Sequence, residues 1–280
     1  MYGSINGVKL FFDCSGPDLV PTNQGMSERP TILALHGGPG FDHAYLKPGL
    51  APIAEIAQII YLDHRGQGRS ESVSVTSCTI EQMADDAAEL CRYLGLNRPV
   101  ILGHSLGGFV ALTLAIRHPD ILSGLILCST TAHVDIKYAC DELERRTTSE
   151  VRHAAEVIFS GSITEDTLSA YSRLVLPHYT HPSTMSALND LGLSRLNPEY
   201  AGYFFAHLLP QYDLRKHLSG ISTPTLILTG DVDWIAPPLW SYELATSIAG
   251  AKLHVIPDTG HFAFNERPQV FADLVRSFLP

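Results

Sequence analysis

The sequence lacks the cysteine pattern of a disulfide-stabilised protein. Its 280 residues include only five cysteines, and no two of them form a C-x-x-C pair. A disulfide framework needs an even set of cysteines at characteristic spacings. We therefore expect free thiols in a cytoplasmic protein. The scattered cysteines are Cys14, Cys78, Cys91, Cys128 and Cys140.

Patterns for metal and dinucleotide binding are also missing. The 13 histidines form no H-x-H or H-x-x-x-H cluster, so we expect no metal site. The G-x-G-x-x-G pattern of dinucleotide-binding loops does not occur either. These two observations predict a protein that works without a cofactor.

Long apolar runs and positive charge are scarce. No apolar stretch approaches the length of a membrane span. Residues 1–10 contain no charged segment followed by an apolar run, so no secretory signal is expected. The formal net charge of −10 argues against a nucleic-acid partner. A small-molecule substrate remains the expected partner, and the oligomeric state is left open.

Short apolar runs alternate with helix-like segments along most of the chain. With 45% hydrophobic residues, the chain has enough apolar side chains for a large core. This alternation predicts an α/β protein with a mostly parallel sheet and helices on both faces. A hairpin with an Asn6-Gly7 turn is expected over residues 3–12. The expected strands are 31–35, 58–62, 100–102, 124–127, 225–228 and 252–255, and the expected helices are 80–94, 109–117, 239–248 and 269–278.

The alternation stops between residues 131 and 218, where helical patterns and charges replace buried strands. Pro177, Pro182, Pro198 and Pro210 divide this region into short pieces. We interpret residues 131–218 as a helical cap inserted into a core that is formed by residues 1–130 and 219–280.

The most informative motif is Gly103-His104-Ser105-Leu106-Gly107, which has the G-x-S-x-G form. An apolar strand precedes it and a helical segment follows it. A serine at such a sharp strand-to-helix turn is typical of the nucleophile of a serine hydrolase. The motif therefore predicts that Ser105 is a catalytic nucleophile and that the backbone N–H of Leu106 faces the developing oxyanion.

A serine nucleophile needs a base, and the base needs an orienting acid. Asp231 and Asp233 both follow the expected strand 225–228. We prefer Asp233 because the pattern that it resembles in serine hydrolases places the acid four residues before a proline, here Pro237. The alternative role for Asp231 is to cap a turn. His261 follows the last expected strand and Gly260, and it is the predicted base. The competing candidate, His254, falls within that strand and is expected to be a packed side chain. The order serine, acid, histidine is the order that this fold requires.

A second oxyanion donor is expected in the loop after strand 31–35. That loop reads His36-Gly37-Gly38-Pro39-Gly40, and its glycines allow the backbone to approach a substrate. We predict that the N–H of Gly38 is the donor, because Pro39 has none. His36 is expected to support the loop.

Together these motifs resemble the α/β-hydrolase superfamily over nearly the whole chain. The stretch 36–40 and the stretch from Asp63 to Ser70, of the form D-x-R-G-x-G-x-S, look like the proline iminopeptidase branch. The motif at residues 103–107 lacks the tryptophan that this branch carries after the serine, and it looks more like the corresponding motif of esterases and lactonases. The resemblance implies a serine hydrolase of small esters, lactones or amides, with an iminopeptidase-like aminopeptidase as the alternative. A ligand receptor that retains the triad is the alternative from another class.

The substrate pocket can be predicted only from aromatic spacing. Tyr203, Phe204 and His207 have the spacing of one helix face in the cap. Tyr45 follows the oxyanion loop and Trp234 follows the proposed acid, so both are also expected to line the pocket. Such a pocket favours an apolar or aromatic substrate group.

Overall fold

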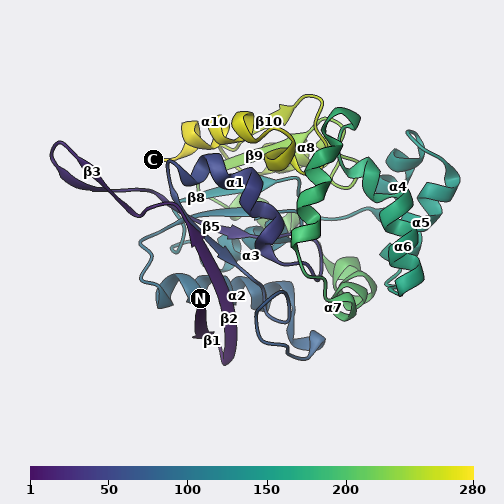
Figure 1. Cartoon of the computed structure of the whole chain (residues 1–280), viewed down its shortest axis with the longest axis horizontal. Helices are drawn as coiled ribbons and strands as arrows, with labels where there is room; N and C mark the ends of the chain where they lie inside the picture. Colours follow the sequence, from purple (N-terminus) through teal and green to yellow (C-terminus); the bar gives the residue numbers. More distant parts are fainter.

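A computed structural model describes all residues from 1 to 280. It confirms the predicted α/β architecture: an eight-stranded sheet in the order β1-β2-β6-β5-β7-β8-β9-β10 has helices on both faces (Figure 1). All strands from β6 to β10 in this order pair in parallel, and the β1–β2 and β2–β6 pairs are antiparallel. The strands are β1 (Tyr2–Ile5), β2 (Val8–Ser15), β5 (Thr31–Leu35), β6 (Gln58–Leu62), β7 (Val100–His104), β8 (Gly124–Cys128), β9 (Thr225–Gly230) and β10 (Lys252–Ile256).

All six predicted central and late strands are present within one or two residues of their expected ends. The predicted Asn6-Gly7 turn joins β1 to β2, with both residues at positive φ (47° and 77°). A second hairpin, β3 (Leu19–Thr22) and β4 (Gly25–Glu28), was not predicted. Its strands are almost entirely exposed, so they carry no buried apolar pattern.

Two apolar layers cover the sheet and explain why its strands are continuous apolar runs. One layer contains side chains of α2, α3 and α8, and the other contains side chains of α1, α9 and α10. The four predicted helices correspond to α2, α3, α8 and α10, whereas α1 and α9 were not predicted. The bounds are α1 (Leu46–Ala54), α2 (Ile80–Tyr93), α3 (Leu106–Arg117), α8 (Pro238–Ser247), α9 (Ala263–Glu266) and α10 (Pro268–Phe278).

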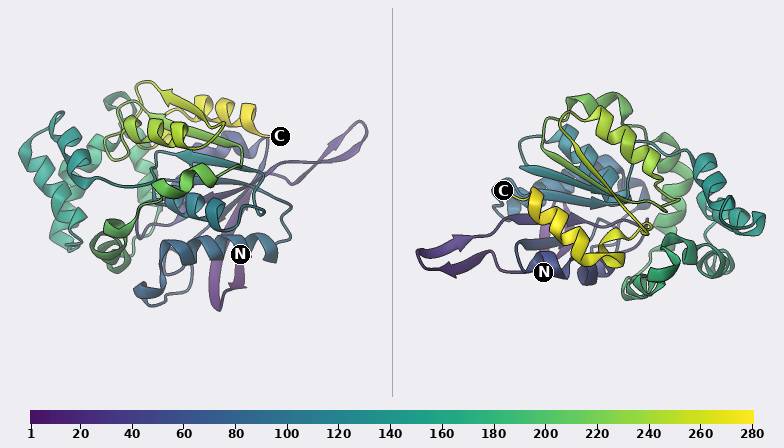
Figure 2. Two further views of the ribbon diagram at one scale, coloured as in Figure 1. Left: turned by 180° about the vertical axis from the view of Figure 1, so that it is seen from behind. Right: turned by 90° about the horizontal axis from the view of Figure 1, so that it is seen from above.

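The segment between β8 and β9 contains no strand and is called the helical insertion below. It lies at one end of the sheet, and the β3–β4 hairpin projects from the opposite end (Figures 1 and 2). Its elements are α4 (Ile136–Glu144), α5 (Ser149–Phe159), α6 (Glu165–Leu174), α7 (Pro198–Tyr203), a π-helical turn η5 (Phe204–Leu208), and the 3₁₀ segments η3 (Leu176–Tyr179), η4 (Pro182–Leu193), η6 (Leu209–Gln211) and η7 (Arg215–Gly220). The division of the chain into core and cap remains a prediction.

Side-chain caps fix where the insertion helices begin. Asp135, Thr148 and Thr164 each accept a hydrogen bond from a backbone N–H in the first turn of α4, α5 and α6. Such caps satisfy donors that have no partner within the helix. A third apolar cluster, which includes Phe159 and Trp234, packs these helices onto the loop after β9. No helix of the structure has both the length and the apolar character needed to cross a membrane.

Candidate active site

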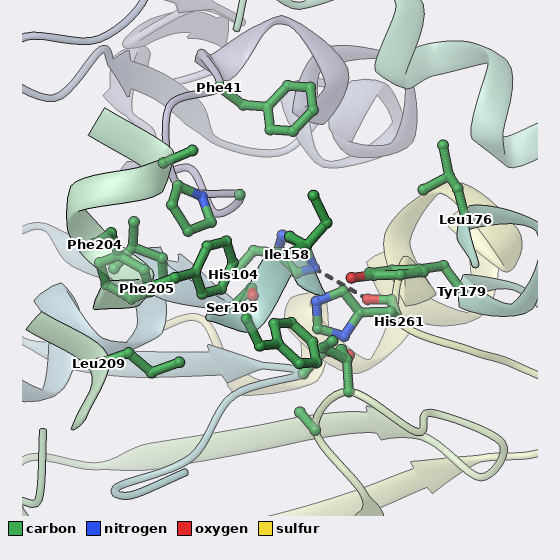
Figure 3. A pocket seen from close by; sticks show the side chains of 18 of the residues that line it. Phe41, His104, Ser105, Ile158, Leu176, Tyr179, Phe204, Phe205, Leu209 and His261 are labelled. Carbon is green, nitrogen blue, oxygen red and sulfur yellow. Dashed lines mark hydrogen bonds between the residues drawn. The ribbon is translucent and has the colours of Figure 1, made fainter. Parts of the chain in front are cut away.

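Ser105 occupies a strained turn between β7 and α3. Its backbone has φ 53° and ψ −119°, a conformation that L-residues rarely adopt. Strain of this kind persists only where the surrounding structure enforces it, and it is concentrated at functional sites. The turn places the Ser105 side chain at the wall of a cavity, beside His261 (Figure 3).

Two glycines allow close contact between the predicted oxyanion loop (residues 36–40) and the predicted nucleophile turn (residues 103–107). A Cβ atom on Gly37 would lie 2.7 Å from the Cβ of Ser105, and one on Gly107 would lie 2.0 Å from the carbonyl oxygen of Leu35. Real Cβ atoms do not approach other atoms so closely. The glycines of both motifs therefore serve one packing contact, which the sequence shows only as two separate patterns.

The structure brings Asp233 and His261 together. The Nδ1 of His261 donates to the Oδ2 of Asp233 at 2.9 Å, and both residues are buried, with 4% and 1% of their surface exposed. The other oxygen of Asp233 accepts the N–H groups of Ile235 and Ala236, each at 3.0 Å. With the proton on Nδ1, the Nε2 of a neutral imidazole keeps its lone pair. A base of that form can take a proton from a serine hydroxyl.

The other sequence candidates have different positions. Asp231 accepts the N–H of Thr259 at 3.1 Å, which is the turn-capping role considered as its alternative. His36 is buried beside the glycine loop; its Nε2 accepts the N–H of His64 at 3.3 Å. His254 lies within β10 as expected, but it is exposed, so the expectation of a packed side chain was wrong.

Two residues that line the cavity, Gly38 and Leu106, have backbone N–H groups without a protein partner. Neither the N–H of Gly38 nor that of Leu106 makes a hydrogen bond to any protein atom. Leu106 is the first residue of α3, where the helix dipole adds partial positive charge. Unpaired donors of this kind are the components of an oxyanion hole. The predicted pair of donors is therefore available, and its role remains a prediction.

A hydrogen-bonded chain joins the three loops of the site. The N–H of Gly37 donates to the Tyr45 hydroxyl at 2.7 Å, and that hydroxyl lies 2.7 Å from the Nδ1 of His104. The Nε2 of His104 lies 3.0 Å from the carbonyl oxygen of His261 (Figure 3). A carbonyl can only accept, so Nε2 carries the proton of His104 and Nδ1 accepts from Tyr45. Burial, followed by the nearby His261, lowers the pKa of His104 well below its usual value, which agrees with a neutral ring.

Sequence reasoning missed a buried carboxylate that holds the base loop. Glu266 accepts the N–H of Gly260 at 2.9 Å and that of Phe262 at 3.2 Å, on either side of His261. It also accepts from the N–H of His181 and from the Thr184 hydroxyl in the helical insertion. The available signal was a glutamate close to the predicted base, but its spacing alone does not distinguish it from a surface residue.

The cavity at Ser105 has a volume of about 250 Å³, and 23 of its 32 lining residues are hydrophobic. None of the lining residues is Asp, Glu, Lys or Arg. The helical insertion supplies much of the wall, including Ile158, Leu176 and Phe205 (Figure 3). A site without a formal charge disfavours charged ligands, because a buried ion needs a partner.

Only two of the five predicted pocket residues line this cavity, Tyr45 and Phe204. The rings of Tyr203 and His207 contact each other at a tilt of 43°, with centroids 4.9 Å apart, and both residues lie outside the lining, with His207 exposed. Their amphipathic side chains tolerate water, whereas the apolar residues Ala201, Phe205 and Leu209 face the cavity instead. Trp234 is also outside the lining, because it packs behind Tyr179 with ring centroids 5.3 Å apart.

The motif from Asp63 to Ser70 makes buried ionic hydrogen bonds next to the glycine loop at residues 36–40. Asp63 accepts from His43 and from the N–H of Arg69, while Arg65 makes two hydrogen bonds to Asp86. Burial raises the pKa of Asp63, but the hydrogen bonds from the His43 side chain and from the N–H of Arg69 outweigh it and bring the pKa to about 2. Asp42, His43 and Asp63 are close enough to share a metal ion. Their carboxylates are already satisfied by protein donors, including the Arg69 side chain on Asp42.

Comparison with known proteins places this fold and site in a family. The family description "alpha/beta hydrolase fold" matches residues 30–268. The chain is 29% identical to a proline iminopeptidase, PfmaB, of Pestalotiopsis fici, over 98% of this chain and 97% of that one. Among solved structures, it is similar to a thermophilic esterase from Thermogutta terrifontis (28% identity, TM-score 0.74, 99% and 96% of the two chains). It is also similar to the enol-lactonase from Burkholderia xenovorans (26% identity, TM-score 0.75, 99% of each chain). With a family match over most of its length, the chain belongs to the α/β hydrolase family.

Proposed function

We propose that this hydrolase cleaves neutral, largely apolar carboxylic esters or lactones through an acyl-enzyme on Ser105. The observation that carries the proposal is the position of Ser105 on a cavity whose lining contains no charged side chain. The ordered Asp233–His261 pair and the two unpaired N–H groups supply the remaining parts of the reaction.

In the first half of the reaction, His261 removes the proton of the Ser105 hydroxyl while the oxygen attacks the ester carbonyl. Asp233 keeps the proton on Nδ1 of His261 and stabilises the imidazolium that forms. The N–H groups of Gly38 and Leu106 stabilise the oxyanion, and each such donor typically contributes about 3 kcal/mol. The imidazolium then protonates the leaving alcohol.

In the second half, water attacks the acyl-enzyme with His261 again as the base. The oxyanion forms at the same two N–H groups, and its collapse releases the acid and restores the Ser105 hydroxyl. For a lactone the leaving alcohol stays attached to the acyl group, so the product is a single hydroxy acid. In this proposal residues 131–218 act as a cap that shapes the cavity and excludes water from it.

Aminopeptidase activity is the second candidate, favoured by the similarity to the iminopeptidase PfmaB over 98% of the chain. Such an enzyme must bind a protonated amine inside the cavity. A buried ammonium group needs a carboxylate or several hydrogen-bond acceptors, and no acidic residue lines the cavity. The site therefore supports an ester or lactone better than a peptide with a free amino end.

Hydrolysis of a panel of substrates tests the proposal directly. We expect turnover of aryl esters and apolar lactones, and we expect Ser105→Ala to reduce it to background. Mass spectrometry should detect an acyl group on Ser105 when deacylation is slow. Faster turnover of a proline arylamide would instead support the aminopeptidase. Tight binding of these compounds without turnover would support the receptor alternative.

A further inference from the structure

Two tyrosines form a polar spot on the largely apolar wall of the cavity. Tyr171 on α6 and Tyr179 on η3 both line the cavity, and their hydroxyl groups are hydrogen-bonded to each other. Figure 3 shows Tyr179 beside His261, with its hydroxyl oxygen directed into the cavity. Neither hydroxyl takes part in the hydrogen bonds that hold Ser105, His261 or Asp233 in place.

The pair has one hydrogen-bond donor more than it can use. A phenol has a single O–H group, and when one tyrosine donates to the other, the proton of the second has no acceptor. Neither hydroxyl makes any other hydrogen bond within the protein. Burial raises the pKa of both phenols, so each keeps its proton at neutral pH. One O–H therefore remains available to a bound molecule.

The position of this donor is fixed relative to the base. The ring of Tyr179 contacts His261 edge-on, with centroids 5.5 Å apart and an interplanar angle of 85°. Its carbonyl oxygen accepts the N–H of His261 at 2.6 Å. Trp234 and Phe262 enclose the ring, with centroids 5.3 Å and 5.9 Å away. A donor held so firmly loses little conformational freedom when it binds an acceptor.

We propose that Tyr179 is a specificity-determining residue: it donates a hydrogen bond to an oxygen of the substrate other than the oxygens of the scissile ester group. Tyr171 donates to Tyr179 and so holds and polarises its hydroxyl. The preferred substrate is then a neutral ester or lactone with a second acceptor, such as an ether or carbonyl oxygen, near His261. This inference rests on the proposed esterase or lactonase function.

The chemical logic is the contrast between the donor and its surroundings. Ile158 and Leu176 line the same cavity and offer no hydrogen bond. A substrate that fills the cavity with carbon alone leaves the O–H of the pair without a partner, whereas an acceptor restores one. A polar site in an apolar pocket therefore discriminates between substrates that differ by one atom.

Two substrate series test this inference. One consists of 4-nitrophenyl esters whose acyl chain has an ether oxygen in place of one CH₂ group, moved along the chain. The other consists of hexanoate esters with the same replacement in the alcohol. We expect the oxygen to raise kcat/KM at one position of one series by about tenfold over the all-carbon ester, the size of one net hydrogen bond.

Variants of Tyr179 and Tyr171 test whether these tyrosines cause the preference for the oxygen-containing ester. Tyr179→Phe should abolish the preference and bring kcat/KM of the oxygen-containing ester down to that of the all-carbon ester, because it removes the hydroxyl that binds the oxygen. Tyr171→Phe should weaken the preference without abolishing it. Tyr203→Phe is the matched control, since Tyr203 lies outside the cavity lining, and it should change neither quantity.

Each outcome has a separate meaning. If no oxygen position is preferred, or if Tyr179→Phe keeps the preference, the role of Tyr179 is overturned while Ser105-dependent turnover of the all-carbon esters still supports the proposed function. If the wild-type protein hydrolyses neither series, both the proposed function and the role of Tyr179 are overturned.

Discussion

The hydroxyl of Tyr45 and the Nδ1 of His104 lie 2.7 Å apart and connect the oxyanion loop to the nucleophile turn. The Tyr45 hydroxyl also accepts a hydrogen bond from the N–H of Gly37, and the Nε2 of His104 donates to the carbonyl oxygen of His261. Three loops that carry the proposed catalytic groups are thus held by two side chains that have no part in bond breaking.

This relationship predicts a specific effect of Tyr45→Phe. The change leaves the buried N–H of Gly37 without an acceptor, which should cost about 1–3 kcal/mol of the free energy of unfolding. Displacement of the oxyanion loop should also lower kcat by roughly tenfold, with a smaller change in KM. Urea unfolding and ester kinetics measure the two effects. Tyr61→Phe is a suitable control, because Tyr61 is as buried and its hydroxyl makes no hydrogen bond; equal losses in both variants would contradict the role of Tyr45.

Substitutions of Asp233 and Asp231 should have very different effects on catalytic activity. Asp233→Asn is expected to lower kcat by about ten-thousandfold, because the amide no longer favours the His261 tautomer that accepts the serine proton. Asp231→Asn should retain activity within about tenfold, since Asp231 only accepts the N–H of Thr259. Steady-state kinetics of both variants with one aryl ester decide the assignment. The reverse order of effects would transfer the acid role to Asp231.

Gly37→Ala should lower catalytic activity by forcing apart the loop after β5 and the turn at Ser105. The new methyl group would lie 2.7 Å from the Cβ of Ser105 and 2.5 Å from the carbonyl oxygen of His104, so the two loops must separate. We expect a loss of at least roughly a hundredfold in kcat, the effect of one lost oxyanion donor. Gly192→Ala is the control, because nothing lies within 4 Å of its added carbon. Normal kinetics for Gly37→Ala would show that the contact is not needed.

Glu266 is expected to position the base rather than to react. Glu266→Gln leaves the N–H groups of Gly260 and Phe262 with a neutral and less symmetrical acceptor. We expect unfolding to become easier by about 1–3 kcal/mol and kcat to fall, with the pH dependence of kcat unchanged. Chemical denaturation and a pH–rate profile measure both effects. A shifted profile would mean that Glu266 takes part in the proton transfers.

Three buried histidines should make the fold sensitive to mild acid. Burial is the first cause that lowers the pKa of His36, His64 and His104 below 6.5. Between that value and their lower folded values the unfolded chain binds more protons, so the free energy of unfolding falls as the pH falls below about 6.5. Each fully neutral histidine contributes a slope of about 1.4 kcal/mol per pH unit.

Urea unfolding at pH 7.5, 6.0 and 5.0 measures this slope. His64→Leu removes one histidine whose ring nitrogens make no hydrogen bond, and it should flatten the slope by about 1.4 kcal/mol per pH unit. His254→Leu removes an exposed histidine and should leave the slope unchanged. A pH-independent stability in the wild-type protein would contradict buried neutral rings at these positions.

The sequence by itself determined the elements that depend on local patterns. Strands such as Thr31–Leu35 are continuous apolar runs, and the turn at Ser105 is marked by glycines next to it, so both can be recognised within a few residues. The proximity of Ser105, Asp233 and His261 was also predictable. Each of them follows a strand, and the carboxyl ends of parallel strands meet at one edge of the sheet. The exposed β3–β4 hairpin was missed because it buries no apolar face.

Only the tertiary structure decided how the site is supported and what it can bind. Tyr45 is 59 positions from His104, and His104 is 157 positions from the carbonyl that it contacts, so no local pattern links them. The same holds for the cavity wall: helical spacing indicated Tyr203 and His207, but packing turned Phe205 and Leu209 inward. Local sequence favours a helix through its own backbone, whereas the face that is buried depends on what the rest of the chain places against it.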